Sequence, residues 1–229
     1  MNAIWNALRW FGESAQWHGP DGIPHRLLEH LYYSALAFAI TVVIALPLGL
    51  LLGHVRGRAS SGLGLSVLLS ANGARALPTL GLLTLVVTLS ASDLVPILIP
   101  LVVLAVPPVL VNAYTGVQQV EPELRDAAEG MGMTGRQVLW RVETPLALPL
   151  VLLGLRTAAI QIVSTAAIAA FVGLGGLGRF IIDGLKRQEY DTTAGGAILV
   201  ILLAFLIQFL FSLLSRTAVS PGLRRTAGS

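Results

Sequence analysis

Long apolar runs separated by short polar segments dominate this chain of 229 residues. A transmembrane helix needs about 20 mostly apolar residues to cross roughly 30 Å of hydrocarbon. Residues 31–53, 94–116 and 194–215 contain no charged side chain, and residues 146–172 contain only Arg156. Each of these four runs therefore predicts a membrane-spanning helix.

A fifth apolar run, residues 62–91, is interrupted by Asn72, Gly73, Arg75 and Pro78. Proline cannot donate to the helical hydrogen-bond ladder, and it disfavours helix at the residue before it. This run therefore predicts a helix that is broken or sharply kinked near Pro78. The fold class that follows is all-α: a polytopic membrane helix bundle with five core transmembrane helices.

Composition supports a membrane protein and excludes several other classes. Charged residues make up only 12% of the chain and the mean hydropathy is +0.77, whereas a soluble domain carries about 25% charge. Polar residues interrupt the first thirty positions before any apolar run begins, so we expect no signal peptide. Cysteine is absent, which excludes disulfides and thiolate catalysis. The four histidines form no spaced ligand set, so we expect them to be interfacial or loop residues and expect no metal site.

The distribution of basic residues predicts an orientation. Five spans place the two ends of the chain on opposite sides of the membrane, and cytoplasmic loops carry an excess of Lys and Arg. One side holds Arg56, Arg58, Arg125, Arg136, Arg141, Arg216, Arg224 and Arg225, and the other holds Arg9, Arg26, Arg179, Lys186 and Arg187. This bias predicts that residues 1–30 form an external N-terminal segment and that residues 216–229 form a cytoplasmic tail. It also explains the net charge of +3 without a nucleic-acid partner.

The polar segment 121–145, which this orientation places in the cytoplasm, has the local signals of two short helices joined by a turn. Pro122 suits the first turn of a helix, and Gly132 suits a left-handed C-terminal cap. Thr134 and Gln137 have the spacing of a capping box for a second helix, which we expect Pro145 to end.

The first of these helices would expose a small, flat surface at Ala127 and Ala128, with Arg125, Asp126 and Glu129 at its rim. Small residues allow another backbone to approach closely, and charges at a rim can fix register, so the segment suits docking. The alternative is an amphipathic helix that lies on the lipid headgroups, with an apolar face formed by Val138, Leu139, Trp140 and Val142.

The spacing within this segment resembles the cytoplasmic coupling signature of ABC import permeases: Glu-Ala-Ala, three residues, Gly, nine residues, then Ile-x-Leu-Pro. The spacing is the same here, with Asp126, Val142 and Thr144 in place of the usual Glu, Ile and Leu. The resemblance implies that the segment docks on a separate ATPase subunit. The residues that would make or orient this coupling contact are Asp126, Ala127, Ala128, Gly132, Val142 and Pro145.

The resemblance extends over about residues 31–215. The stretches GARALPTLGLL, from residue 73, and GLRTAAIQIVSTAAIAAFVGLGGLG, from residue 154, resemble permeases of osmoprotectant importers, which handle glycine betaine, choline, carnitine or proline betaine. A MetI-like permease architecture is implied, in the bacterial inner membrane. An importer of methionine or another small solute remains an alternative, and so does a non-transport scaffold that binds a cytoplasmic protein.

This resemblance also implies partners: ATPase subunits, an extracytoplasmic substrate-binding protein, and a second permease copy or a related permease in the lipid bilayer. The chain contains no Walker-type loop, since its only lysine is Lys186. ATP would therefore be bound by the ATPase subunit, and this chain would need no cofactor and would not itself be an enzyme. No constellation of nucleophile, base and oxyanion donors suggests a membrane enzyme.

A second candidate site is an outer gate or pathway. A charge inside the membrane is costly, about 2.5–3.5 kcal/mol on insertion scales, so Arg75 and Arg156 must face protein, water or an interface. Glycines permit tight turns, and the loop from residue 173 to 193 could dock a binding protein through Arg179, Asp183 and Lys186, or be a plain re-entrant turn. The gate or pathway candidates are Arg75, Pro78, Gly173, Gly175, Gly176 and Gly178.

Overall fold

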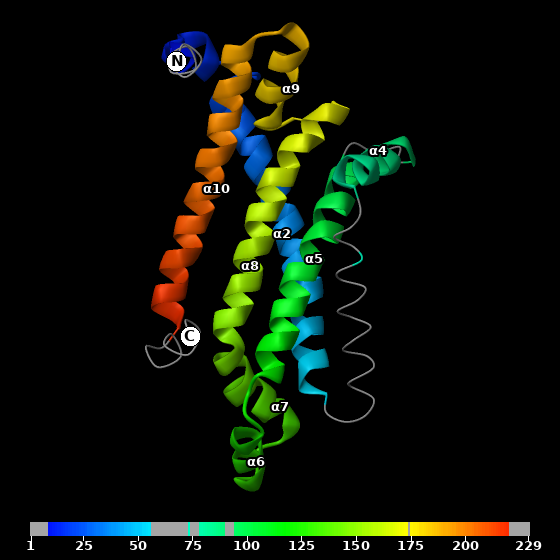
Figure 1. The fold of residues 1–229 in the computed structure, drawn as a ribbon, viewed down its shortest axis with the longest axis vertical. Coiled ribbons are helices and arrows are strands. Elements are labelled where there is room, and N and C mark those ends of the chain that lie inside the picture. Colours follow the sequence, from blue (N-terminus) through cyan, green and yellow to red (C-terminus); the bar gives the residue numbers. More distant parts are fainter. Residues whose placement is uncertain (1–8, 56–72, 74–77, 90–93, 174, 220–229) are drawn as a thin grey trace. The chain divides into compact units, whose positions relative to one another are not determined.

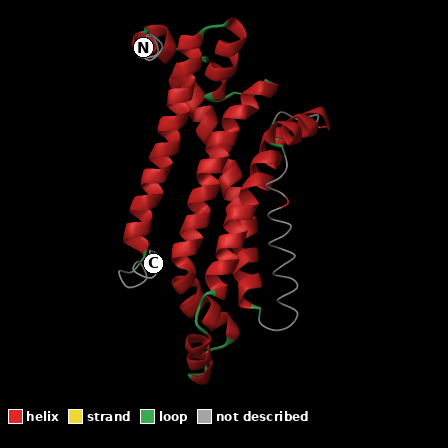
Figure 2. Cartoon of the chain, in the orientation of Figure 1, coloured by secondary structure: helices red, strands yellow, loops and turns green. Residues whose placement is uncertain are grey.

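The computed structural model describes residues 9–55, 73, 78–89, 94–173 and 175–219 (Figure 1). Within these ranges every regular element is helical (Figure 2), which confirms the predicted all-α class. Four stretches are long and apolar enough to cross a membrane: Ile23–His54, Leu98–Gln118, Gly135–Val172 and Tyr190–Ala218. They overlap four of the five predicted spans.

The long helices are α2 (Ile23–His54), α5 (Val95–Gln118), α8 (Thr144–Ala166) and α10 (Tyr190–Ala218). The shorter elements are η1 (Ser14–Trp17), α4 (Thr79–Leu89), α6 (Pro122–Gly130), α7 (Gly135–Val138), the π-helical turn η2 (Leu139–Glu143), the 3-10 helix η3 (Ala167–Val172) and α9 (Gly178–Arg187).

The first long helix begins at Ile23 rather than at about residue 31. The predicted external segment 1–30 therefore includes η1 and about two turns of α2. The predicted span begins at residue 31 because it is defined as a run without charged residues, which excludes Arg26 and Glu29. In the structure these two side chains form an ion pair at 2.8 Å along the helix. The helix can therefore extend through its polar first turns.

Most of the second predicted span, including Arg75, lies outside the described residues. Its described part is α4, which begins at Thr79 directly after Pro78. The Pro78 carbonyl accepts the first helical bond, from the Leu82 N–H at 2.9 Å. Pro78 thus marks the start of a helix, the position where the lack of an N–H costs least.

The chain divides into two compact units, and the long helices contribute residues to both. The first unit comprises Met1–Ala39, Leu77–Val102 and Ala159–Ile207. The rings of Trp10 and Phe180 meet edge to face in its core, with centroids 5.2 Å apart. Trp10 reaches α10 only because residue 195 is glycine, where a Cβ would clash with the indole. The rest of this core is Ile23, Val163, Leu177 and Leu203.

The second unit comprises Ile40–Ala76, Val103–Ala158 and Gln208–Ser229. Glycines bring its helices close together: a Cβ at Gly53 of α2 would lie 2.7 Å from Val117 Cβ of α5, and a Cβ at Gly116 of α5 would lie 3.0 Å from Ala147 Cβ of α8. Small residues at helix contacts are the usual means of close packing in membranes. The core of this unit is Leu50, Ala113, Val117, Leu139, Ala147 and Val151.

Candidate functional site

The segment between α5 and α8 is built by local capping signals. Pro122 occupies the first turn of α6. Gly132 has φ +84°; its N–H donates to the Glu129 carbonyl at 2.9 Å and the Met133 N–H donates to the Ala128 carbonyl at 3.1 Å. This pair of bonds is the Schellman motif, and it confirms the predicted left-handed cap.

The second short helix begins as predicted but does not end where predicted. The backbone N–H of Thr134 donates to Gln137 Oε1 at 2.8 Å, which confirms the capping box. Pro145 does not stop the helix: α7 continues through η2 into α8. In η2 the Thr144 N–H bonds to the Leu139 carbonyl, five residues back. The prediction was wrong because this wide π turn accommodates a residue that has no N–H of its own.

The predicted coupling residues divide between exposed and buried positions. Asp126 and Ala127 are exposed on α6, as is Gly132 after it. Ala128, however, is only 2% exposed, so the predicted surface at Ala127 and Ala128 is wrong in its second half. Figure 1 shows α6 and α7 side by side beyond the ends of α5 and α8 in this unit.

The remaining residues of the signature lie on η2 and α8. Val142 is half-buried and Pro145 is exposed. Val138 and Leu139, at 1% and 3% exposure, are packed inside the protein. They are therefore not free to lie on lipid headgroups, which removes half of the apolar face of that alternative, while Trp140 remains 56% exposed.

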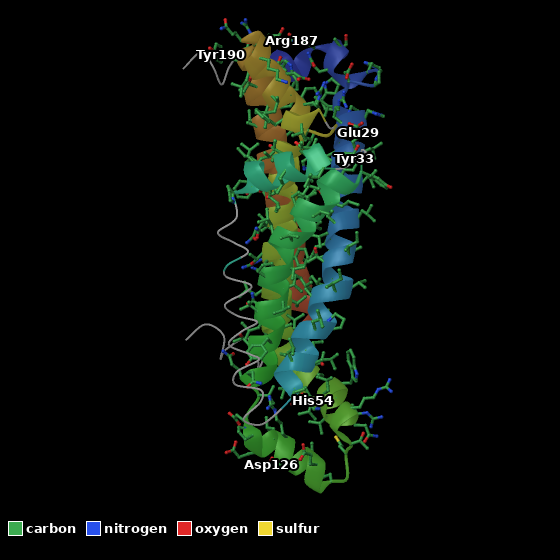
Figure 3. All side chains as sticks on the ribbon, turned by 90° about the vertical axis from the view of Figure 1, so that its right-hand side faces the viewer. Glu29, Tyr33, His54, Asp126, Arg187 and Tyr190 are labelled. Atoms are coloured by element: carbon green, nitrogen blue, oxygen red, sulfur yellow. The ribbon has the colours of Figure 1, made fainter. Side chains whose placement is uncertain are left out.

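Sequence reasoning missed a buried charge cluster beneath α6. Glu143 is fully buried, with Oε1 2.9 Å from Arg125 Nε and Oε2 2.6 Å from His54 Nδ1. Arg125, expected at an exposed rim, is 5% exposed. His54 is the last residue of α2 instead of lying in a loop, and it is labelled in Figure 3. A carboxylate and an arginine in a segment next to an apolar span were the signals that could have suggested this pair.

Two of the gate candidates, Gly175 and Gly176, meet the carboxylate of Glu29 on α2, which is labelled in Figure 3. Glu29 Oε2 accepts the Gly176 N–H at 2.9 Å and pairs with Arg26. A side chain at Gly175 would collide with this carboxylate. Next to it, His30 is 1% exposed and its Nε2 lies 3.1 Å from the Val163 carbonyl. Thus His30 is a core residue, not the expected interfacial one.

The other two gate glycines shape the backbone around this contact. Gly173 has φ +91° and ends η3, and a Cβ at Gly178 would collide with the Ala167 carbonyl oxygen. The expected loop 173–193 contains the helix α9 over Gly178–Arg187, then a turn at Gln188, where φ is +62°, and the start of α10 at Tyr190.

A polar cavity of about 310 Å³ opens beside α9. Arg179 Nε and Asp183 Oδ2 pair at 3.1 Å on its wall, whereas Lys186 is exposed and outside it. The lining residues are Gln16, Asp21, Arg26, Arg179, Phe180, Asp183, Gly184, Arg187, Glu189 and Thr192. Within the described ranges, no group of three or more His, Asp or Glu side chains is placed to hold a metal ion.

Of the two arginines in apolar runs, only Arg156 is described, and it lies half-buried on α8. In the part of the chain that the structure describes, four membrane-length helices, with a capped helix–turn–helix between two of them, define a multi-pass membrane protein.

The chain belongs to the family described as binding-protein-dependent transport system inner membrane component, whose model matches residues 45–225. It is 34% identical to the glycine betaine/carnitine/choline transport system permease protein OpuCB of Bacillus subtilis, over 86% of this chain and 88% of that protein. It is 31% identical to the osmoprotectant import permease protein OsmW of Salmonella typhimurium, over 86% of this chain and 91% of that protein.

Solved structures give the same fold. An inward-facing structure of the MetNI methionine ABC transporter matches with a TM-score of 0.75 and 25% identity, over 86% of this chain and 96% of that chain. An amino acid ABC transporter crystallised with histidines matches with a TM-score of 0.68; at 21% identity it bears on the fold alone. The MetI-like architecture is thereby confirmed.

Proposed function

We propose that this chain is the membrane-spanning subunit of an ATP-driven importer for a small osmoprotectant such as glycine betaine, carnitine, choline or proline betaine. The observation that carries the proposal is the α6–α7 segment, which lies between two membrane-length helices and exposes Asp126 and Ala127. The named cargoes of relatives that are 31–34% identical support the solute class.

In this proposal α6 docks in a groove of a separate ATPase subunit. The exposed Asp126 supplies a charge, and Ala127 allows the close approach of another backbone. ATP is bound and hydrolysed by that subunit, and this chain carries no cofactor. When the ATPases close, α6 is displaced, and the permease passes between two states of access, as in other switches where one bistable element is biased from a distant site.

High-affinity capture of the solute is assigned to a separate extracytoplasmic binding protein. Quaternary ammonium groups are held tightly by aromatic cages. The close aromatic pairs in the described residues are Trp10 with Phe11, Trp10 with Phe180, and Tyr32 with Tyr33. Trp10 is 3% exposed and lies in the core, so the two pairs that include it are not open to a solute. The burial of these two pairs favours a low-affinity passage in this chain.

The proposal includes a second permease subunit and an orientation. Five spans are too few to enclose a polar solute, and the most apolar window of α10 is only 6% buried within the chain. This exposed face is available to lipid or to a second permease.

The excess of basic residues favours an external N-terminus, with α6, α7 and the C-terminus in the cytoplasm.

The solute class is tested by uptake of radiolabelled glycine betaine, in cells that lack other betaine carriers and express this chain with its ATPase and binding protein. Unlabelled choline or carnitine should compete and methionine should not. Competition by methionine alone would refute the osmoprotectant assignment.

The coupling role is tested by Ala127→Arg and by Gly132→Trp. Both should abolish uptake and co-purification of the ATPase while the protein still inserts in the membrane. Ala127→Ser is the matched control, because it preserves a small side chain at the exposed position, and it should retain both. Normal uptake in Ala127→Arg would favour a scaffold that does not couple ATP hydrolysis to transport.

A further inference from the structure

The carboxylate of Glu143 is fully enclosed where η2 meets α8, and each of its oxygens faces a different helix. Oε1 lies 2.9 Å from Arg125 Nε of α6, and Oε2 lies 2.6 Å from His54 Nδ1 at the end of α2. The side chain of Arg125 is 6% exposed and that of His54 is 26% exposed. One side chain thus binds two segments, of which His54 is 89 residues and Arg125 is 18 residues away from Glu143 in sequence.

A second set of bonds joins the same helix ends. Arg125 Nη2 donates to the Val117 carbonyl in the last turn of α5. Gln118 Nε2 donates to the Gly53 carbonyl in the last turn of α2 at 2.6 Å. The last four carbonyls of a helix have no partner within it. Here one of these carbonyls in each helix, that of Val117 in α5 and that of Gly53 in α2, is bound by a side chain of a neighbouring segment. Together with the contacts of Glu143, these bonds connect the adjoining ends of α2, α5, α6 and η2.

Stability alone does not account for a buried charge at this position. A buried ion pair is often no more stabilising than apolar residues of the same volume, since both charges must leave water. Apolar contacts already hold α2 against α5, through Gly53 and Val117 and through Gly49 and Ala113. Charged groups add geometric specificity. A carboxylate bound by both an arginine and a histidine fixes one arrangement of the helices, whereas apolar surfaces can slide past one another.

We infer that Glu143 is a positioning residue that locks α6 to the ends of α2 and α5, so that these helix ends move with α6 as one body. Arg125 and His54 are the two arms of this lock. The force that moves α6 comes from the ATPase, so the role in transport rests on the proposed function, but the lock itself is a property of this chain.

The lock is tested first in the purified full-length permease without any partner. The chain contains no cysteine, so Leu124→Cys on α6 and Leu51→Cys on α2, both exposed, accept spin labels specifically. Pulsed electron paramagnetic resonance should give one narrow distribution of the distance between the two labels. Glu143→Gln should at least double its width, and Glu123→Gln, at an exposed position of α6, should leave it unchanged.

A second variant guards against loss of folding. Arg125→Met combined with Glu143→Leu removes both charges, and such apolar replacement of a buried pair is commonly tolerated. This double variant should fold and still show the broad distribution. An unchanged width in the folded double variant would overturn the lock.

Transport then tests what the lock does. In proteoliposomes with the ATPase and binding protein, the double variant should retain ATPase co-purification and basal ATP hydrolysis within twofold, while solute uptake per ATP falls at least tenfold. A parallel loss of ATPase binding and uptake, with their ratio unchanged, would show a merely structural role and overturn the inference. If the parent permease bound no ATPase, the proposed function would fail, and the spin-label result would still decide the lock.

Discussion

The two units of the chain use the same kind of charged pair in different surroundings. In the first unit, Arg179 and Asp183 each keep 30% side-chain exposure beside a polar cavity. In the second unit, Glu143 is fully buried against Arg125. Exposed pairs contribute about 0–1 kcal/mol, whereas a buried charge that loses its partner is strongly destabilising. Surroundings, not the residue types, decide which pair the fold depends on.

The comparison predicts the largest effect for Glu143→Ala. This change leaves Arg125 buried without its carboxylate, and we expect a loss of about 3–5 kcal/mol in the free energy of unfolding. Denaturant unfolding of the detergent-purified protein measures it. A loss below about 1 kcal/mol would mean that water reaches Arg125 and that the two units do not differ as described.

A smaller loss is expected for Gly53→Ala, which tests close packing in the second unit. The new Cβ would lie 2.7 Å from Val117 Cβ, and such overpacking costs about 1–3 kcal/mol. Gly130→Ala is the matched control: it lies in α6, where a Cβ would meet nothing within 4 Å. The control should be neutral, or stabilise by about 0.5–1 kcal/mol through helix propensity. Equal unfolding energies for the two variants would contradict a tight contact between α2 and α5.

In the first unit, Glu29→Gln should cost about 1 kcal/mol. The amide oxygen can still accept the Gly176 N–H, but the ion pair with Arg26 is lost, and that pair is partly screened because Glu29 keeps 24% side-chain exposure. The same unfolding assay measures the change. A cost as large as that of Glu143→Ala would show that the first unit also depends on a desolvated charge.

The smallest effect is expected for Asp183→Asn, at about 0.3–0.5 kcal/mol, the usual value of a surface pair four residues apart. Salt should distinguish this pair from the buried one, because screening weakens exposed charges most. Unfolding at 0.1 and 1 M NaCl should bring parent and Asp183→Asn together while the Glu143→Ala difference persists. A salt-independent difference for Asp183→Asn would place that pair out of water.

Features set by neighbouring residues could be predicted from the sequence. The cap at Gly132 and the Thr134–Gln137 box depend on backbone geometry within a few residues, and both are present. The helix α9 could also have been foreseen, since Arg179 and Asp183 have helical spacing. The expectation of a loop gave too much weight to the glycines that precede it.

Features set by distant segments could not be predicted in this way. His54 and Glu143 are 89 residues apart, and nothing local indicates that they meet. The burial of Ala128 depends on which side of the nine-residue helix α6 faces the protein. A helix of about two turns is too short for its pattern of apolar and polar residues to show which face is buried. Asp126 and Glu129 are both acidic, so their charges do not distinguish one face of the helix from the other.

The π turn at Leu139–Glu143 has a further consequence for how this permease can change over evolution. One extra residue in a helix rotates everything before it by about 100° relative to everything after it, because a turn contains 3.6 residues. Deletion of a single residue there would therefore swing α7 about the axis of α8 and point a different side of it outward. The number of residues in that turn therefore determines which side of α7 faces outward. Homologous chains that keep the same partner should keep the length of the turn even where its residues differ.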